Sequence, residues 1–141
     1  MAEANAKRGS RAARPLSPHL QIYKMPVNML MSIVHRITGG ALYVGTLLVV
    51  WVLVAAASGP DYFATVTGLL GTWPGLIVLF GYTWALLHHL VGGLRHFLWD
   101  TGRGYDLAMV DLLSWGTLAV SAALTILIWS YALLAGGGAD L

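Results

Sequence analysis

The sequence contains no cysteine and very little charge. With no cysteine among its 141 residues, the chain can form no disulfide, no thiolate metal site and no iron–sulfur cluster of its own. Charged residues make up 10% of the chain and hydrophobic residues 57%, whereas roughly a quarter of an ordinary soluble domain is charged. The formal net charge of +2 leaves no basic surface for nucleic acid once the apolar segments are set aside. These absences favour one small domain in a lipid bilayer.

Several motifs of soluble enzymes are absent too. The chain shows no tandem repeat and no motif of a catalytic nucleophile. The paired Gly92 and Gly93 lie inside an apolar run with no strand before them, which argues against a phosphate-binding loop. The five histidines are therefore the only soft nitrogen ligands that the chain offers to a metal or cofactor.

Three apolar runs are long enough to cross a membrane. The first covers residues 37–57, with an amphipathic lead-in from about residue 27. As a helix its 21 residues would be about 31 Å long, against about 30 Å for the hydrocarbon core of a bilayer. A soluble helical bundle, the main alternative, would need polar faces that these runs lack. We therefore predict an all-α membrane protein with three transmembrane helices, at about residues 30–57, 73–99 and 110–135.

The remaining segments connect or flank these spans. Residues 1–26 are predicted to be a basic, flexible leader, because three prolines oppose a long helix there and the segment does not resemble a cleavable signal peptide. A loop at 58–72, which can hold a short interfacial helix, and a turn at 101–106 separate the spans. The transmembrane anchor is thus predicted over residues 27–135, with a tail at 136–141.

The distribution of lysine and arginine predicts the orientation in the membrane. Of the eight basic residues, six precede or open the first span and two lie at the end of the second span or just after it. With the N-terminus on the cytoplasmic or matrix side, all eight lie on that side, as the positive-inside rule requires. We therefore predict an N-terminus inside and a C-terminus outside. The eight are Lys7, Arg8, Arg11, Arg14, Lys24, Arg36, Arg95 and Arg103.

The end of the second span carries a group of histidines and glycines. In an α-helix, His89, Gly92, Gly93 and His96 share one face. An imidazole can ligate iron, and glycines let a flat macrocycle approach the backbone, so this face predicts one wall of a haem pocket inside the membrane. His88 projects about 100° away, and we assign it packing or hydrogen bonding. The competing interpretation is a buried histidine pair that is hydrogen-bonded between helices.

A second polar group opens the first span. Ser32, His35 and Arg36 place a hydroxyl, an imidazole and a fixed cation just below the inner interface, with Gly39 and Gly40 directly deeper. Each has a simpler explanation. Arg36 can anchor the helix at lipid phosphates, Ser32 can bond to its own helix, and the glycines can serve close helix packing.

The two groups are predicted to meet at one level. Span two runs inward, so His89 lies about 9 Å deeper than Arg95, and His35, Arg36, Arg95 and His96 share a layer. So many potential cations repel one another unless an anion lies among them, such as haem propionates or acidic residues of a partner. His35 and His96 lie too near the interface to oppose His89 well. A second axial ligand is therefore expected from another chain.

Asp100 and the tryptophans mark the membrane boundaries. Asp100 is either a solvated interfacial carboxylate or a group that delivers protons or pairs with a soluble partner. Trp73, Trp99 and Trp115 are interpreted as interfacial aromatics.

Three motifs together resemble a known family. They are Arg-Pro-Leu-Ser-Pro-His-Leu-Gln-Ile-Tyr at 14–23, Ser-Ile-Val-His-Arg-Ile-Thr-Gly at 32–39, and His-x-x-x-Gly-x-Arg-His-x-x-Trp-Asp at 89–100. In order, spacing and three-span layout they resemble the large cytochrome b membrane-anchor subunit of succinate dehydrogenase, over roughly residues 14–135. The first motif resembles the mitochondrial branch and its bacterial relatives.

The resemblance implies an assembly and a set of cofactors. The chain would be one subunit of a succinate:quinone oxidoreductase, without succinate chemistry of its own, in a bacterial cytoplasmic or mitochondrial inner membrane. A smaller three-span anchor subunit would share one haem b with it and supply the second axial ligand. A flavoprotein subunit with FAD and an iron–sulfur subunit would dock on the inner face, and electrons from succinate would reach ubiquinone.

The resemblance also implies roles for single residues. By the motif match His89 is an axial haem ligand, since counting from His88 would break the Arg-His ending. Ser32 and Arg36 would line the quinone site. The propionates would lie near His35, Arg36 and His96, with Arg95 in the same surroundings.

A mechanism for quinone reduction follows as a hypothesis. The Ser32 hydroxyl would donate to a quinone carbonyl, and the charge of Arg36 would favour the anion that forms on reduction. Protons would arrive from the inner side, through Asp100 and water.

Two other functions remain open. A fumarate reductase anchor would run the same chemistry in reverse, because direction depends on potentials and quinone type. A non-redox membrane scaffold or transporter subunit would contain no pigment and would not need His89.

Overall fold

The computed structural model describes residues 17–136, and over that range every regular element is a helix. Most of the predicted leader and of the tail lies outside the described residues. Where the leader is described it contains a short helix, α2 (Pro18–Ile22), followed by an extended connection to the first long helix.

Three long helices form the body of the molecule: α3 (Val27–Ser58), α5 (Trp73–Asp100) and α6 (Leu107–Gly136). All three are long and apolar enough to cross a membrane. The predicted spans are therefore confirmed as helices, and α3 and α6 each begin three residues earlier than predicted. With 32 residues, α3 would be about 48 Å long, so part of it extends beyond a hydrocarbon core of about 30 Å.

The segment between the first two spans is mostly helical. Gly59 ends α3 with φ of 126°, a backbone conformation that favours glycine, and Pro60 begins α4 (Pro60–Leu70). Trp51 of α3 donates its indole N–H to the Tyr62 hydroxyl of α4 at 2.9 Å, which ties α4 back against the C-terminal half of α3. The segment 58–72, predicted as a loop that can hold a short helix, thus contains a helix of 11 residues.

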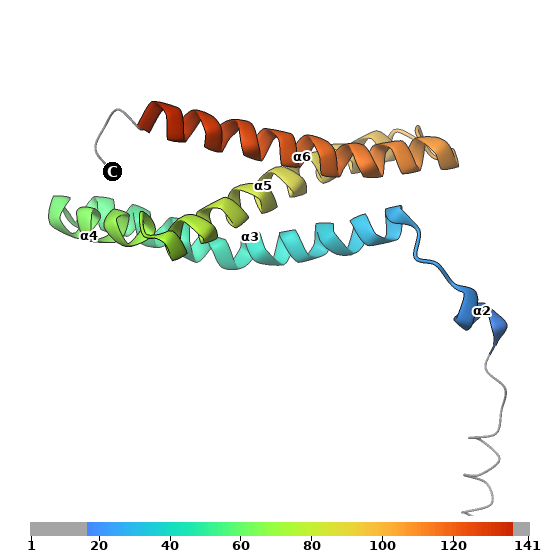
Figure 1. Cartoon of the computed structure of the whole chain (residues 1–141), viewed down its shortest axis with the longest axis horizontal. Coiled ribbons are helices and arrows are strands. Elements are labelled where there is room, and N and C mark those ends of the chain that lie inside the picture. Colours follow the sequence, from blue (N-terminus) through green and yellow to red (C-terminus); the bar gives the residue numbers. More distant parts are fainter. Residues whose placement is uncertain (1–16, 137–141) are drawn as a thin grey trace, which may run out of the picture.

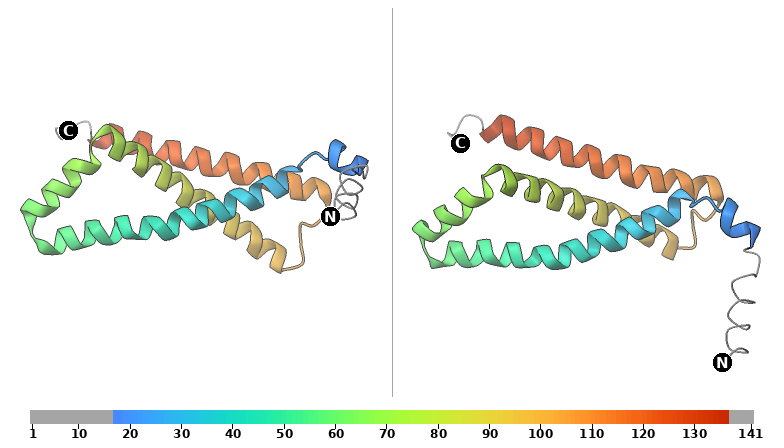
Figure 2. Two further views of the ribbon diagram at one scale, coloured as in Figure 1. Left: turned by 90° about the horizontal axis from the view of Figure 1, so that it is seen from below. Right: turned by 60° about the horizontal axis from the view of Figure 1, so that its bottom comes forward.

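The long helices lie side by side with the connections at opposite ends. The α2 segment and the turn between α5 and α6 lie at one end, whereas α4 and the end of α6 lie at the other (Figure 1). The α5 helix crosses α3 in both further views, and α6 runs along the other side of α5 (Figure 2). Arg36, near the start of α3, and Arg103, just after α5, therefore lie toward the same end of the molecule.

The contact between α5 and α6 is polar and close. Four small hydroxyl residues recur at i, i+3, i+7 and i+11 along α6, all of them buried: Ser114, Thr117, Ser121 and Thr125. All four hydroxyls donate to carbonyls of the same helix, so that the oxygens remain available to donors on α5. Small residues on this face let the two backbones approach closely.

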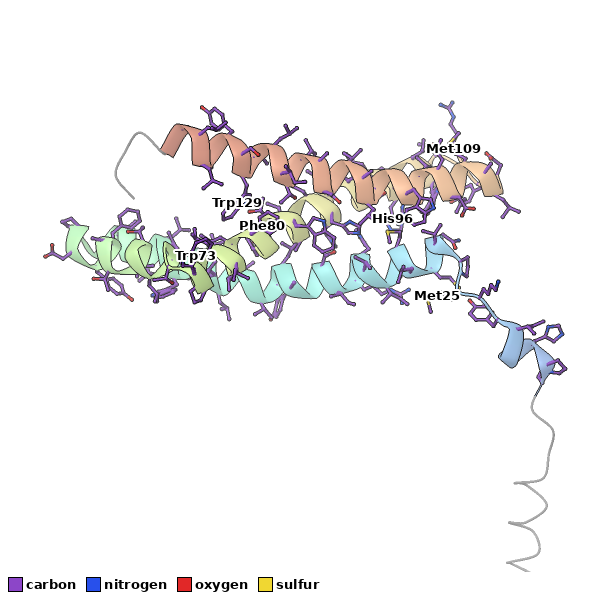
Figure 3. All side chains as sticks on the ribbon, viewed as in Figure 1. Met25, Trp73, Phe80, His96, Met109 and Trp129 are labelled. Carbon is purple, nitrogen blue, oxygen red and sulfur yellow. The ribbon has the colours of Figure 1, made fainter. Side chains whose placement is uncertain are left out.

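Three side-chain hydrogen bonds connect α5 to α6. Arg95 donates to Ser114 at 3.2 Å, His88 bonds Ser121 at 3.2 Å, and Trp129 donates to Thr83 at 3.3 Å. The ring of Phe80 meets Trp129 edge-on beside the last of these bonds (Figure 3). The bonds fix how α5 is rotated, and so decide which of its residues face α3.

Candidate functional site

The His89 ring is held by the backbone and a hydroxyl of α3. Its Nδ1 atom lies 3.1 Å from the carbonyl oxygen of His35 and 3.4 Å from Oγ1 of Thr38. The Thr38 hydroxyl donates its proton to the same carbonyl at 2.9 Å. Both neighbours of Nδ1 therefore act as acceptors, so Nδ1 carries the hydrogen. The lone pair of the neutral ring then lies on Nε2.

Gly39 leaves the space that the His89 ring occupies. A Cβ atom at Gly39 would lie 3.0 Å from Cε1 of His89 and 3.8 Å from its Nε2. Any side chain there would crowd the free edge of the imidazole. The side chain that requires a small residue at position 39 is therefore that of His89, the histidine selected by the motif match.

His35 packs flat against His89. The two ring centroids are 4.0 Å apart and the planes differ by 6°, while His96 lies 5.1 Å from His35 at a steeper angle. His35 in turn fills the space above Gly92, where a Cβ would lie 2.5 Å from its Nδ1. Three imidazoles and two glycines thus form the crossing of α3 and α5, and His96 lies between these helices in Figure 3. We name His35, His89 and His96 the imidazole cluster.

The imidazole cluster is no site for a bare metal ion. Within residues 17–136, no group of three His, Cys, Asp or Glu side chains is placed to hold one. His89 can offer one nitrogen to a metal whose other ligands come from elsewhere. This matches the way in which an axial histidine serves a haem iron.

His88 faces the opposite way. It is completely buried between α5 and α6, with Nδ1 at 3.2 Å from Ser121 and the ring at 5.1 Å from Trp84. Ser121 donates to the carbonyl of Leu118, so its oxygen accepts from His88. This is the packing and hydrogen-bonding role that the sequence predicted for His88. Because the His88 side chain has no exposed surface, a macrocycle cannot reach it in this arrangement of the helices.

Arg95 also turns toward α6. Only 5% of it is exposed; its guanidinium bonds Ser114 and lies 4.9 Å from the centre of the Trp99 ring. The predicted layer of four cationic groups is therefore divided. His35 and His96 meet on the α3 side of α5, whereas the contacts of Arg95 lie on the α6 side.

Trp99 is more than an interfacial aromatic. Its indole N–H donates to the carbonyl of Gly104 at 3.1 Å, and its ring meets that of His96 edge-on at 5.4 Å. Tyr105 donates to the Trp99 carbonyl at 3.0 Å. Trp99 thus joins the turn after α5 to both Arg95 and His96.

The remaining predicted site residues lie at the surface of this chain. Ser32 is half-buried and Arg36 is exposed, one helical turn apart near the start of α3. Asp100 is exposed at the last residue of α5. These positions leave the three side chains accessible to a ligand or a neighbouring subunit, and the first two flank His35 in the sequence of α3.

An apolar groove of about 820 Å³ lies between α3 and α5, on the α4 side of the imidazole cluster, and none of the three histidines lines it. Its floor includes Ala85, one turn before His89, and Gly40, the neighbour of Gly39. The backbone of Gly81 is open as well, since within residues 17–136 no other element lies within 4 Å of the position that a Cβ would take there. The lining residues are Ile37, Gly40, Ala41, Val44, Gly45, Leu47, Leu48, Trp51, Val78, Gly81, Tyr82 and Ala85.

Comparison with known proteins places the chain in a family. Residues 10–128 match the family of succinate dehydrogenase/fumarate reductase transmembrane subunits. The chain is 43% identical over 118 residues to the succinate dehydrogenase cytochrome b556 subunit of Paracoccus denitrificans, covering 84% of this chain and 91% of that protein. It is 35% identical over 116 residues to the Rickettsia prowazekii cytochrome b556 subunit, covering 82% and 90%. The mitochondrial cytochrome B subunit of Schizosaccharomyces pombe is 36% identical over 126 residues, covering 84% and 69%.

Proposed function

Because the chain belongs to the family of succinate dehydrogenase cytochrome b membrane-anchor subunits, we propose that it binds a haem b through His89 and contributes Ser32 and Arg36 to a ubiquinone site. The haem would supply one-electron redox chemistry within the membrane. The chain's own residues would ligate it, orient it and hold the quinone. Succinate oxidation belongs to other subunits of the complex.

The observation that carries the haem proposal is the hydrogen bond from His89 Nδ1 to the His35 carbonyl, 3.1 Å long. Histidines that bind metals commonly donate their second ring nitrogen to a carbonyl, which fixes the tautomer and the ring orientation. Here that bond is already made within the chain, and it leaves Nε2 as the ligating atom. The residues present therefore fit an axial haem ligand.

The surroundings of His89 favour it over His88. His89 is half-buried, and Ala85, one turn before it, lines the apolar groove between α3 and α5, whereas His88 is enclosed. Among the described residues outside its own stretch of α5, none lies within 4 Å of a Cβ position at Gly93, one turn after His89. A macrocycle or a partner helix can therefore approach the backbone there.

Anionic groups of the haem would lie toward the inner end of the imidazole cluster. His35 and His96 come from two helices and meet at 5.1 Å, and Arg36 follows His35 in the sequence. Charged and polar donors of this kind stabilise carboxylates. Arg95, which packs against Trp99 and Ser114, would act on them only at longer range.

The proposed assembly follows from this placement. The second axial ligand would come from a smaller anchor subunit packed against the α3–α5 side, and the iron–sulfur and flavoprotein subunits would dock at the end that carries Arg36, Asp100 and Arg103. That end would face the cytoplasm or matrix, as the basic residues predict. Asp100, exposed at the end of α5, would take part in proton delivery to the quinone.

The quinone role of Ser32 is tested by replacing it with alanine in the intact complex. Loss of the hydroxyl removes a hydrogen bond to a quinone carbonyl, which is worth about 0.5–1.5 kcal/mol, or roughly twofold to tenfold in rate. We expect succinate-dependent quinone reduction to fall by that factor, while succinate oxidation with an artificial acceptor is unchanged.

Ser58→Ala is the matched control. Ser58 lies at the opposite end of α3 and donates only to the Val54 carbonyl, so both activities should stay at the wild-type level. Quinone kinetics in Ser32→Ala that equal those of this control would contradict the proposed site.

A further inference from the structure

We propose that Thr38 is a positioning residue for His89 and raises the reduction potential of the haem that His89 would ligate. This inference rests on the haem ligation proposed above. Thr38 is neither the proposed iron ligand nor part of the proposed quinone site, so its effect on the haem would act through His89.

The geometry places Thr38 between the two partners of one hydrogen bond. Thr38 is 2% exposed at the crossing of α3 and α5. Its hydroxyl donates to the His35 carbonyl at 2.9 Å, and its oxygen lies 3.4 Å from Nδ1 of His89. The same carbonyl accepts from Nδ1 of His89 at 3.1 Å. The His35 carbonyl oxygen thus accepts hydrogen bonds from both the Thr38 hydroxyl and His89, the proposed iron ligand.

Sharing the carbonyl weakens its effect on His89. A carbonyl that accepts from the second nitrogen of a ligating histidine raises the basicity of the ligand, and a more basic ligand favours oxidised iron. A second donor on the same oxygen draws electron density away from that bond. The Thr38 oxygen is also near Nδ1, but at 3.4 Å it is the longer and weaker of the two acceptors, so the effect through the carbonyl decides the sign. Because the Thr38 hydroxyl is the second donor to that carbonyl, it keeps His89 less basic and the proposed haem easier to reduce.

The rest of the His89 environment keeps the ring in place when the hydroxyl is removed. His35 covers one face of the ring at 4.0 Å, and the backbone at Gly39 closes its Cε1 edge. Valine has nearly the shape of threonine. Thr38→Val should therefore remove the donor and leave the imidazole where it is, with a shorter Nδ1–carbonyl hydrogen bond.

The same helix supplies a matched control. Thr46 donates to the Tyr43 carbonyl three residues earlier, as Thr38 does to His35, but Thr46 is exposed and far from His89. Thr46→Val therefore makes the same substitution and removes the same kind of hydrogen bond from a side chain to a backbone carbonyl, at a position away from His89. Thr38→Ser keeps a hydroxyl at this position and is therefore the conservative variant that should behave like the wild type.

The experiment is a redox titration of the purified complex, followed in the α-band of the haem. We expect the midpoint potential of Thr38→Val to be lower than that of the wild type. The expected change is on the order of threefold to tenfold in the ratio of reduced to oxidised haem at a fixed potential, where tenfold corresponds to about 59 mV for one electron. Thr46→Val and Thr38→Ser should titrate like the wild type. A midpoint in Thr38→Val that is unchanged or higher overturns the inference.

Two further variants keep the outcome decisive. If Thr38→Val does not assemble, Thr38→Ala removes the same hydroxyl with less volume and must also lower the midpoint.

His89→Ala distinguishes failure of the Thr38 inference from failure of the proposed haem ligation. If His89→Ala loses the haem while Thr38→Val titrates like the wild type, the proposed ligation stands and the role of Thr38 is wrong. If His89→Ala keeps a normal haem signal, both are wrong.

Discussion

Replacing Gly92 by alanine is expected to lower both the stability and the haem content of the complex. A Cβ at this position would lie 2.5 Å from Nδ1 and 3.1 Å from Cε1 of His35. The His35 ring cannot retreat without leaving its stacked position on His89, 4.0 Å away. Overpacking of this kind costs about 1–3 kcal/mol, and here the strain falls on the imidazole cluster.

The Gly92→Ala result is checked by the haem-to-flavin ratio and the thermal unfolding of the purified complex. Gly68→Ala is the control, since Gly68 is also helical but nothing lies within 4 Å of its Cβ position. Alanine is about 0.5–1 kcal/mol better than glycine inside a helix, so this control should be as stable as the wild type or more so. Equal stability and equal haem content in the two variants would contradict the packing of His35 on Gly92.

Replacing Gly75 by alanine is expected to disrupt the corner between α4 and α5. A Cβ there would overlap the carbonyl oxygen of Leu70 and would lie 2.7 Å from that of Leu69. These are backbone atoms at the corner between α4 and α5, where Thr72 caps α5 by accepting from the Gly75 N–H. No side-chain rotation can relieve the overlap, so the corner itself must move, at a cost of about 1–3 kcal/mol or more.

The Gly75→Ala result is measured as the yield and unfolding temperature of the assembled complex, again beside Gly68→Ala. The corner sets where α5 begins and therefore the height of His89 relative to α3. A fall in yield or in unfolding temperature that Gly68→Ala does not share supports the tight corner. A variant that assembles and melts like the control would show that the corner is looser than described.

The helices and their approximate ends could be predicted because the apolar runs are long and the breaks between them are clear. Gly59 and Pro60 mark one break, and the turn at 101–106 marks the next. Whether the segment after Pro60 is helical could not be settled by its pattern. In the structure its position depends on the bond between Trp51 and Tyr62, a contact between residues of different elements.

The separation of His88 from His89 could also be predicted, because adjacent residues on a helix point about 100° apart. The partner of His88 could not. Its partner, Ser121, belongs to a buried series of small hydroxyl residues on α6 whose helical spacing is visible in the sequence. That spacing was the available signal for the α5–α6 contact, and it also provides the partner of Arg95.

The directions of the side chains at the C-terminal end of α5 could not be predicted from the sequence pattern. Equal depth in the membrane suggested that Arg95 and His96 act together, yet they point to different neighbours. Arg95 packs on Trp99 and toward α6, while His96 faces His35. Depth follows from counting residues, whereas direction depends on how α5 is rotated against two other helices. For the same reason Thr38 gave no signal of its own, since its role depends on the crossing of α3 over His89.

The most direct test of haem ligation by His89 is a reduced-minus-oxidised optical spectrum of the purified complex. The spectrum should be recorded for the wild type, His89→Ala and His88→Ala, with all subunits confirmed present. We predict a b-type signal in the wild type, its loss in His89→Ala, and its retention in His88→Ala, because His88 is enclosed between α5 and α6. A normal b-type spectrum in His89→Ala, or a wild-type complex with every subunit and no haem, would contradict the account.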